Sequence, residues 1–203
     1  GCGVTVMNGP AAPDWTATSD DPNNRDAKRA ALQYLAAARR VHTDCDLLEF
    51  VERELEARTV LDIGVVSHSE RYFDQPDWRH GRIARRARRC VGIDILEPLV
   101  EELRRRGFDV RCVDATSGAD IGERFERVFI GDVLEHVDNM VALLRFSARH
   151  LAAGGRILAT TPNPFSRKFF RNFRREGTAI VNLDHLCWIT PTQAMELARR
   201  AGL

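Results

Sequence analysis

The sequence predicts an α/β protein with a doubly wound, mostly parallel sheet that is preceded by helices. Two observations carry this prediction. Five short apolar, β-branched stretches alternate with stretches of helical periodicity, as expected for strands that are covered on both faces. Most of these strand-like stretches also end in an acidic residue, and the carboxyl ends of parallel strands are where such sheets bind ligands.

The chain divides into three parts that precede or form the sheet. Residues 1–24, rich in Gly, Ala, Pro, Asp, Asn and Thr, predict a flexible arm that becomes ordered only if something docks it. Residues 25–57 predict N-terminal helices, because apolar residues follow helical spacing from Arg25 and again after the N-cap candidates Thr43 and Asp44. Residues 58–203 then form the sheet domain.

Within that domain the expected elements follow one another in alternating order. Strands are expected at residues 59–64, 90–95, 109–114, 127–131 and 156–161. Helices are expected at residues 79–89, 97–106, 139–151 and 192–201, the last behind the Thr190-Pro191 start signal. The link between the third and fourth strands has room for at most a turn of helix, around residues 119–123.

Composition excludes several classes of partner. The chain has 30 Lys and Arg against 29 Asp and Glu, so no global field points to nucleic acid or to a membrane surface, and partner predictions depend on local clusters. Five separated cysteines without a Cys-x-x-Cys pair favour a reduced, cytoplasmic protein. No apolar stretch approaches the length of a membrane span. We therefore expect no membrane partner, and a homo-oligomer is left open.

Acidic and polar residues recur at the strand ends, and this series resembles the class I S-adenosylmethionine-dependent methyltransferases over residues 59–203. Three stretches look like the branch of small-molecule methyltransferases related to ubiquinone-biosynthesis and sugar or polyketide O-methyltransferases. They are Gly131-Asp132-Val133-Leu134-Glu135-His136-Val137, the Thr161-Pro162-Asn163-Pro164 run, and Asp184-His185-Leu186-Cys187-Trp188-Ile189-Thr190-Pro191. The resemblance implies S-adenosyl-L-methionine as cofactor, S-adenosyl-L-homocysteine as product and a small-molecule acceptor, such as a hydroxyl of a secondary metabolite or sugar.

The resemblance also implies roles for the strand-end residues, each beside a structural alternative. Asp94 is placed to accept both ribose hydroxyls, since a carboxylate takes several donors, or to cap the helix that follows. Asp114 and Ala115 would meet the adenine with Ile95 on the ring face, or Asp114 would serve a turn. Gly64 would let the backbone approach the methionine part of the cofactor. The expected cofactor-binding set is Asp62, Gly64, Asp94, Ile95, Asp114, Ala115 and Asp132.

The loop after Gly64 departs from the family. Its glycine-rich turn would place glycines at Val66 and His68, and neither is present. Asp94 follows Gly64 by 30 residues, against about 20 in a dinucleotide-type fingerprint, so about ten extra residues lie in residues 67–78. These features keep open a non-catalytic binding or assembly subunit that retained the sheet.

Two histidines are candidates for the general base that a hydroxyl acceptor needs. His136 follows the fourth strand, and His185 lies between the fifth strand and the last helix. Each has a structural alternative, as a hydrogen-bonded residue of a helix turn or as a brace of the Trp188 loop. No metal is expected, because Asp132, Glu135 and His136 lie on one turn and lack a ligand from elsewhere. His80 and His150 are expected to be exposed on helical surfaces.

Two basic stretches and the C-terminal end complete the analysis. Residues 79–89 predict a helix with a solvated arginine face. Residues 165–175 mix phenylalanine with Arg and Lys. This composition suits a lid that clamps an acidic acceptor, or a lid helix with its phenylalanines inward. It also suits an RNA methyltransferase, although nucleic acid is the less favoured partner. The family resemblance implies two further C-terminal strands, and these are missing from the 203 residues, so the domain is expected to be truncated or to leave a sheet edge open.

Overall fold

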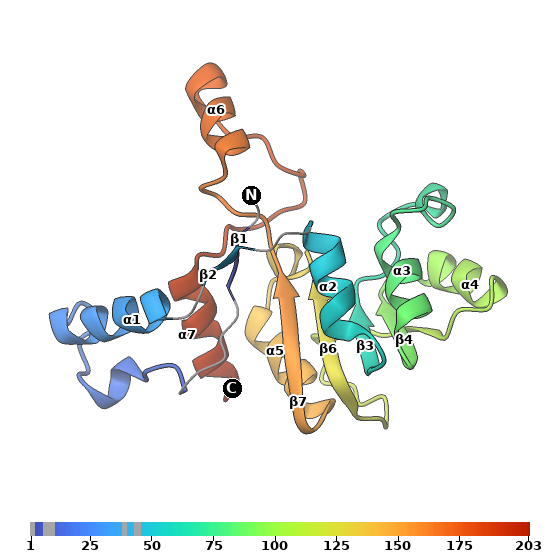
Figure 1. Ribbon diagram of the computed structural model, residues 1–203, viewed down its shortest axis with the longest axis horizontal. Coiled ribbons are helices and arrows are strands. Elements are labelled where there is room, and N and C mark those ends of the chain that lie inside the picture. The colour runs from blue at the N-terminus through green and yellow to red at the C-terminus, as the bar shows by residue number, and fades with distance from the viewer. Residues whose placement is uncertain (1–2, 6–10, 38–39, 43–45) are drawn as a thin grey trace.

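A five-stranded parallel sheet forms the centre of the molecule, and helices cover both of its faces (Figure 1). The computed structural model describes residues 3–5, 11–37, 40–42 and 46–203. The strands lie in the order β5, β4, β3, β6, β7, and every neighbouring pair is parallel. Their bounds are β3 Thr59–Ile63, β4 Arg89–Asp94, β5 Val110–Cys112, β6 Phe125–Gly131 and β7 Leu151–Thr160. The doubly wound α/β fold predicted from the sequence is confirmed.

Helices and short 3-10 turns alternate with these strands. They are α2 Leu47–Leu55, η2 Glu70–Tyr72, α3 Arg79–Arg86, α4 Glu97–Arg105, η3 Leu134–His136, α5 Met140–Arg149, α6 Arg167–Glu176 and α7 Pro191–Ala201. Helix α7 begins with a capping box between Thr190 and Gln193, the start that the sequence indicates. None of the helices in the described ranges is long and apolar enough to cross a membrane.

The two faces of β3 carry different side chains, and this alternation positions the rest of the site. Val60 packs with apolar residues of α2 and α3, whereas Leu61 and Ile63 pack with α5 on the other face. Because strand side chains alternate, Asp62 belongs to the face of Val60 and points toward α3. The central strands β3 and β6 are therefore covered on both faces, whereas the edge strand β7 has no fully buried residue.

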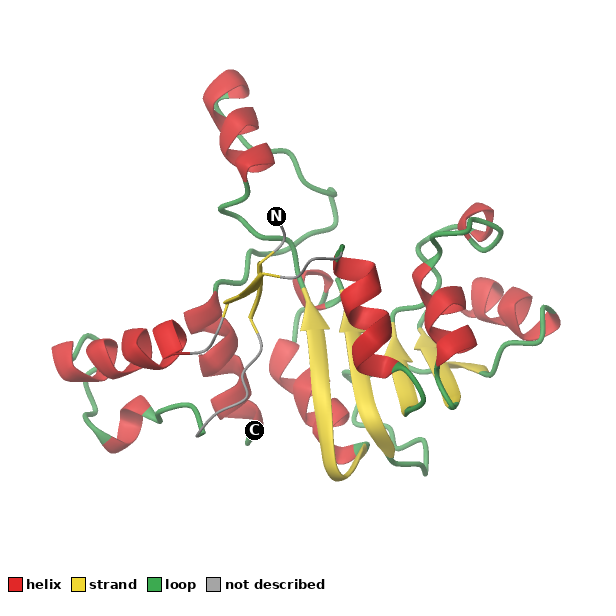
Figure 2. Ribbon diagram, viewed as in Figure 1, coloured by secondary structure: helices red, strands yellow, loops and turns green. Residues whose placement is uncertain are grey.

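The N-terminal part docks on the last helix. Strands β1 Gly3–Thr5 and β2 Arg40–His42 pair antiparallel, and η1 Trp15–Ala17 and α1 Arg25–Ala37 lie between them in the chain (Figure 2). The indole Nε1 of Trp15 donates to Glu196 of α7 over 2.8 Å, and the Arg199 guanidinium lies over the same ring. This is the kind of docking that an ordered arm requires. The division of the chain at residues 24 and 57 stays a prediction.

Some boundaries differ from the sequence expectation. Strand β7 begins at Leu151 rather than near residue 156, and its pairing with β6 shifts register between Leu151 and Arg156, where Gly154 has φ +70°. Strand β5 has only three residues, and residues 119–123 contain no helix. The helix expected at residues 139–151 ends at Arg149.

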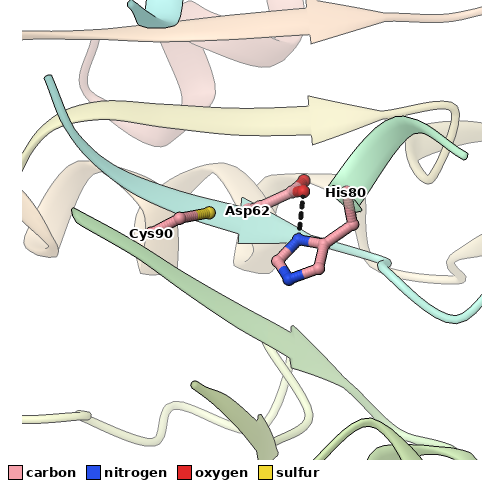
Figure 3. Close-up of side chains that lie close together, drawn as sticks. All are labelled: Asp62, His80 and Cys90. Atoms are coloured by element: carbon pink, nitrogen blue, oxygen red, sulfur yellow. Dashed lines mark hydrogen bonds and ion pairs between the residues drawn. The ribbon is translucent and has the colours of Figure 1, made fainter. Parts of the chain in front are cut away.

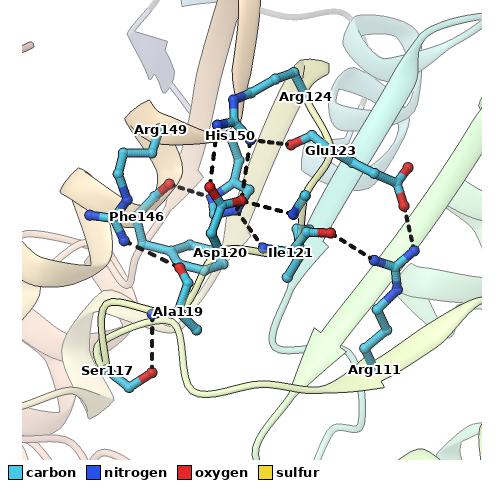
Figure 4. Close-up of polar contacts among 11 residues, drawn as sticks. Arg111, Ser117, Ala119, Asp120, Ile121, Glu123, Arg124, Phe146, Arg149 and His150 are labelled. Carbon is cyan, nitrogen blue, oxygen red and sulfur yellow. Dashed lines mark hydrogen bonds and ion pairs between the residues drawn. The ribbon is translucent and has the colours of Figure 1, made fainter.

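A polar cluster next to the first residues of β6 and β7 occupies the position of the turn of helix expected at residues 119–123 (Figure 4). His150, expected to be exposed, is fully buried there: its Nδ1 donates to the Phe146 carbonyl over 2.7 Å, and its Nε2 accepts from the Ile121 amide over 3.1 Å. The Asp120 carboxylate accepts the Gly122 amide, and this bond, followed by one from Arg124, lowers the pKa of Asp120 to about 2. His150 is buried because the loop between β5 and β6 wraps around the end of α5.

Candidate active site

A cavity of about 1040 Å³ opens at the carboxyl ends of the parallel strands. Ligand pockets in proteins have volumes of about 300–1,000 Å³, so this cavity is large enough for a cofactor and a smaller second molecule. Eight of the nine residues predicted as site residues line it: Gly64, Asp94, Ile95, Asp114, Ala115, Asp132, His136 and His185. The strand-end pattern thus places these residues in one cavity, and their roles stay predictions.

Gly64 ends β3 in a conformation that requires glycine. Its φ is +82°, and a Cβ atom there would lie 2.3 Å from Cγ2 of Val133. Its amide donates to the Ile93 carbonyl over 2.9 Å, which extends the ladder to the strand end. A side chain at this position is excluded both by the backbone and by the neighbouring strand end.

The turn that follows Gly64 has two residues in the left-handed conformation that favours glycine, although neither of them is glycine. Ser67 has φ +50° and His68 has φ +62°, both in the left-handed region. For a residue other than glycine this region costs about 1–2 kcal/mol. The surrounding contacts must therefore hold the turn in place.

Trp78 and Arg79 supply two of these contacts. The buried indole Nε1 of Trp78 donates to the Val65 carbonyl over 3.2 Å, inside the loop. Arg79 donates from Nη1 to Oδ2 of Asp132 over 2.7 Å and from Nη2 to the Gly131 carbonyl over 2.6 Å. The end of the extra loop is thus fixed to the end of β6, and the Arg79 side chain becomes part of the cavity wall.

His80 supplies the third contact, through a buried pair with Asp62 (Figure 3). Nδ1 of His80 lies 2.7 Å from Oδ2 of Asp62, and the two side chains are only 2% and 3% exposed. Gly92 on β4 makes room for the imidazole, because a Cβ there would lie 2.8 Å from the ring. Burial, followed by the charge of Asp62, raises the pKa of the adjacent Cys90 thiol well above its ordinary value, so this cysteine stays protonated at neutral pH.

The structure does not bring Asp62 to the cavity, in contrast to the expectation from the sequence. Its side chain points to the face that α3 covers, where His80 binds it. His80 is likewise buried and not exposed as expected, because helix α3 places it beneath the loop rather than on the surface. This histidine and carboxylate hold the loop to the sheet.

Asp94 binds backbone amides at the entry to α4 and in the loop after Gly64, and its ribose role stays a prediction. Its Oδ1 accepts from the amides of Ile95 and Leu96, over 2.8 and 3.2 Å, which fixes the entry to α4. Its Oδ2 accepts from the Val66 amide over 3.1 Å. A carboxylate offers about four acceptor positions, so one position remains for a ligand hydroxyl.

Asp114 and its neighbours line the next part of the cavity. Oδ1 of Asp114 accepts from both the amide and the hydroxyl of Thr116, each over 2.7 Å, as a turn residue does. Within the described part of the chain no group donates to its Oδ2. Ile95 is 65% exposed and Ala115 is buried, and both lie on the cavity wall. The turn role and a ligand contact are therefore compatible at Asp114.

His136 and His185 lie side by side in the cavity, with ring centroids 4.5 Å apart and ring planes at 85°. Nδ1 of His136 is 3.1 Å from Oδ2 of Asp184, and Nε2 of His68 is 3.9 Å from the same oxygen. The Nδ1 atom of His136 is buried and makes no hydrogen bond to the described residues, so Asp184 lies at ion-pair distance without a directed bond. The other nitrogen of His136 can then accept a proton from a ligand.

Two carboxyl groups beside these histidines have shifted pKa values. Burial, together with the charge of Asp132, raises the pKa of the Glu135 carboxyl, whose Oε1 is buried without a hydrogen bond from the described residues. Partial desolvation opposes ionisation of Asp184, but its backbone hydrogen bond and the charges of His136 and His68 hold the pKa of Asp184 below its usual value. Asp184 is thus the ionised partner of the histidines.

Two groups of side chains could hold a metal here. The ligand atoms of Glu135, His136 and His185 lie within 4.8 Å of one another, and so do those of His68, His136 and Asp184. Nitrogen and carboxylate oxygen are ligands that zinc accepts. Asp132 is not part of either group, and its carboxylate pairs with Arg79. The metal-free site expected from the sequence stays a prediction.

The segment after β7 closes one wall of the cavity. Lys168 and Phe169 of α6 line it, and the Phe169 ring packs on Trp188 with centroids 4.8 Å apart at 83°. The Leu186 amide donates to the Glu135 carbonyl over 2.8 Å and ties this segment to η3. Of the three phenylalanines in α6, only Phe169 faces inward in this way.

Sequence reasoning missed three residues of the site. Arg79 was assigned to a solvated arginine face, although Trp78 and His80 on either side of it are unusual at the head of such a helix. Asp184 directly precedes His185, and this adjacency was the available signal. His68 was noted only as part of the aberrant loop.

Comparisons with known proteins agree with this geometry. A family model described as a methyltransferase domain matches residues 34–203. No curated protein matches the chain. Among solved structures, a putative methyltransferase from Bacillus halodurans is 18% identical with a TM-score of 0.56, and the match covers 77% of this chain and 68% of that one.

Two further structures have the same fold. An S-adenosylmethionine-dependent methyltransferase from Thermotoga maritima, described as a possible histamine N-methyltransferase, is 21% identical over 76% of this chain and 68% of that one, with a TM-score of 0.53. The YcgJ protein from Bacillus subtilis is 17% identical over 76% and 66%, with a TM-score of 0.54. With the family model covering most of the chain and the cavity at the strand ends, the chain belongs to the methyltransferase domain family within the class I S-adenosylmethionine-dependent methyltransferases.

Proposed function

We propose that this methyltransferase acts on a hydroxyl group of a small molecule, such as a secondary metabolite or a sugar, with His136 as general base. The observation that carries the proposal is the His136 and Asp184 pair beside the free volume of the cavity. A hydroxyl acceptor must lose its proton as it is methylated, and a histidine beside a carboxylate is suited to take it near neutral pH.

S-adenosylmethionine is the cofactor of this enzyme, and the residues of the cavity fit it. The remaining acceptor position of Asp94 suits a ribose hydroxyl, and Gly64 leaves the backbone bare for close approach. When bound, the cofactor supplies an electrophilic sulfonium methyl group. Carboxylates outnumber cations around the cavity, which suits a cationic ligand. The carboxylates are Asp94, Asp114, Asp132, Glu135, Asp138 and Asp184, and the cations are Arg79 and Lys168.

The acceptor would lie between the cofactor and the histidines. His136 takes the hydroxyl proton at the ring nitrogen that faces away from Asp184, and the Asp184 carboxylate stabilises the imidazolium that results. His185, at right angles to the first ring, is the second candidate base. Val66, Phe169 and Trp188 help to separate the reacting groups from solvent, since Val66 is buried and Phe169 packs on Trp188.

Cofactor binding can be tested by titration calorimetry with S-adenosylmethionine and S-adenosylhomocysteine. We expect Asp94→Ala to weaken the binding of both by at least about tenfold, since a charged acceptor contributes about 1.5–3 kcal/mol per hydrogen bond. Asp74→Ala is the matched control, because Asp74 is an exposed carboxylate that pairs with Arg106 outside the cavity. Equal affinity of the Asp94 variant and the control would contradict the assignment of Asp94.

The acceptor class can be tested with matched pairs of small molecules that carry either a hydroxyl or an amine. Release of S-adenosylhomocysteine is measured for each pair with the wild-type enzyme and with His136→Gln. We expect turnover of the hydroxyl members, with loss of that turnover in the variant. Turnover of amines alone would contradict the proposal for the acceptor while leaving the cofactor assignment in place.

A further inference from the structure

We propose that α6 and the segment that follows it dock on an anionic lipid surface. This α6 surface consists of the exposed apolar residues Phe165, Phe170, Phe173, Ile180, Leu183 and Leu186 and the cations Arg167, Lys168, Arg171, Arg174 and Arg175. Lys168 and Ile180 of this surface also line the cavity, and its other nine residues lie outside it. The proposal replaces the expectation of no membrane partner, which came from the overall charge of the chain and the lack of a membrane span.

Exposed apolar side chains are concentrated on this surface. Of the eleven large hydrophobic residues that are exposed in the described part of the chain, six lie within residues 165–186. Leu183 is 99% exposed and Phe165 is 77% exposed. Single exposed apolar residues are ordinary, but a concentration of them marks an interaction site.

Helix α6 separates these apolar residues from its cations. At about 100° of rotation per residue, the exposed Phe170 and Phe173 lie about 60° apart, and the five cations fall within a sector of about 120° on another side of the helix. The third phenylalanine, Phe169, packs inward on Trp188. An interfacial helix of this type places its aromatic sector among the acyl chains and its cations at the level of the lipid phosphates.

The cations of α6 differ from those of the neighbouring helices in their partners. In α4 and directly after it, Arg104, Arg105 and Arg106 each pair with a glutamate of the same helix. In α6, only Arg175 has a carboxylate partner among the described residues, namely Glu176, and the other four cations have none. A surface with unpaired positive charge attracts anionic lipid at a distance comparable to the Debye length.

The position of α6 allows it to meet a flat surface. It projects away from the sheet and from the other helices, joined by a loop at each end (Figures 1 and 2). The helix is already formed, since Ser166 caps its start and Gly177 ends it with φ +72°. Docking therefore needs neither folding of the helix nor rearrangement of the sheet.

The composition of the surface favours lipid over RNA. Phenylalanine next to arginine suits base stacking as well as lipid, but the aliphatic Ile180, Leu183 and Leu186 have no flat face on which a base can stack. A second copy of the chain is disfavoured because it would bring the same unpaired cations into contact with one another. An anionic bilayer matches both the aliphatic residues and the charge.

Sedimentation of the whole chain with lipid vesicles tests the proposal. We expect binding to phosphatidylcholine vesicles that contain about 30% phosphatidylglycerol, no binding to phosphatidylcholine alone, and weakening with added salt. Phe170→Ser with Phe173→Ser should reduce binding at least tenfold. Arg171→Gln with Arg174→Gln should reduce both binding and its salt dependence. None of these four residues lines the cavity, so cofactor affinity should not change.

Two matched variants and an RNA titration decide between the partners. Leu32→Ser removes an exposed apolar residue of α1, and Arg25→Gln with Lys28→Gln removes two cations there, so both should bind vesicles as the wild type does. Failure of the folded wild-type chain to bind anionic vesicles would overturn the proposal. Binding of RNA that depends on the same arginines, without vesicle binding, would assign the surface to RNA instead. Concentration-dependent dimers lost in the phenylalanine variant, again without vesicle binding, would assign it to a second copy.

Discussion

Two pairs of histidine and aspartate differ in this molecule in their exposure and in the roles that we assign to them. The pair of His80 and Asp62 is closed in the core, with both side chains at most 3% exposed and 2.7 Å between nitrogen and oxygen. The pair of His136 and Asp184 lies in the cavity wall, with its carboxylate 55% exposed and 3.1 Å from the ring. The same two groups thus occur once without access to a ligand and once with it.

The difference shows that exposure to the cavity, and not residue type, distinguishes a structural pair from a pair that can react with a ligand. His80 is enclosed by Trp78, Phe108 and β4, so its ring contacts only protein. His136 contacts a second histidine and free volume. We therefore expect the buried pair to stabilise the structure around the cavity and the open pair to take part in the reaction.

The largest effect is expected when the buried pair loses one partner. Asp62→Ala leaves His80 buried without its carboxylate, which typically costs about 3–5 kcal/mol. Urea unfolding followed by tryptophan fluorescence measures this loss. The control, Asp109→Ala, removes an exposed carboxylate at the start of β5 and should change the free energy of unfolding by about 0.5 kcal/mol or less. A loss below about 1 kcal/mol for Asp62→Ala would show that the pair does not hold the loop.

The open pair should show the reverse pattern, with an effect on rate and little on stability. His136→Gln should lower kcat by about 10²–10⁴-fold, the usual contribution of a general base, and Asp184→Asn by about tenfold because the ring keeps its proton acceptor. Dialysis against EDTA should leave kcat unchanged if no metal takes part. If His136→Gln kept the wild-type kcat, or if EDTA abolished the activity of the wild-type enzyme, His136 would not be the general base.

The smallest change in stability is expected at the turn of Ser67 and His68, whose backbone is left-handed. His68→Gly relieves a left-handed backbone at φ +62° and should stabilise the fold by about 1 kcal/mol. Its side chain is 66% exposed and its contact with Asp184 is long, so little is lost. The midpoint of urea unfolding should therefore rise. A lower midpoint would show that the imidazole itself holds the turn.

Much of this arrangement follows from local sequence. The strands at residues 59–64 and 90–95 are continuous apolar runs, and the residues at their ends meet because parallel strands share one edge. Gly64, Asp94 and Asp114 could therefore be assigned to one cavity before the structure was known. Alternation along β3 was the missing step for Asp62, since it places this residue on the face of Val60.

Contacts that depend on the path of a long loop could not be predicted. The periodicity of residues 79–89 indicates which side of the helix is polar, but it does not tell that Arg79 reaches the end of β6 or that His80 lies under the loop. His150 is similar, because its burial depends on how residues 113–124 pass the end of α5. Spacing along the chain carries no information about such closures.

The three contacts made by Trp78, Arg79 and His80 change what the loop after Gly64 depends on. A glycine-rich turn owes its shape to its own backbone, whereas this turn is bound from outside by Trp78, and Arg79 and His80 fix the adjoining helix to the sheet. Movement of α3 away from the sheet would therefore release the turn and open the wall of the cavity in a single step. In this enzyme we expect exchange of the cofactor to be governed by the docking of one short helix.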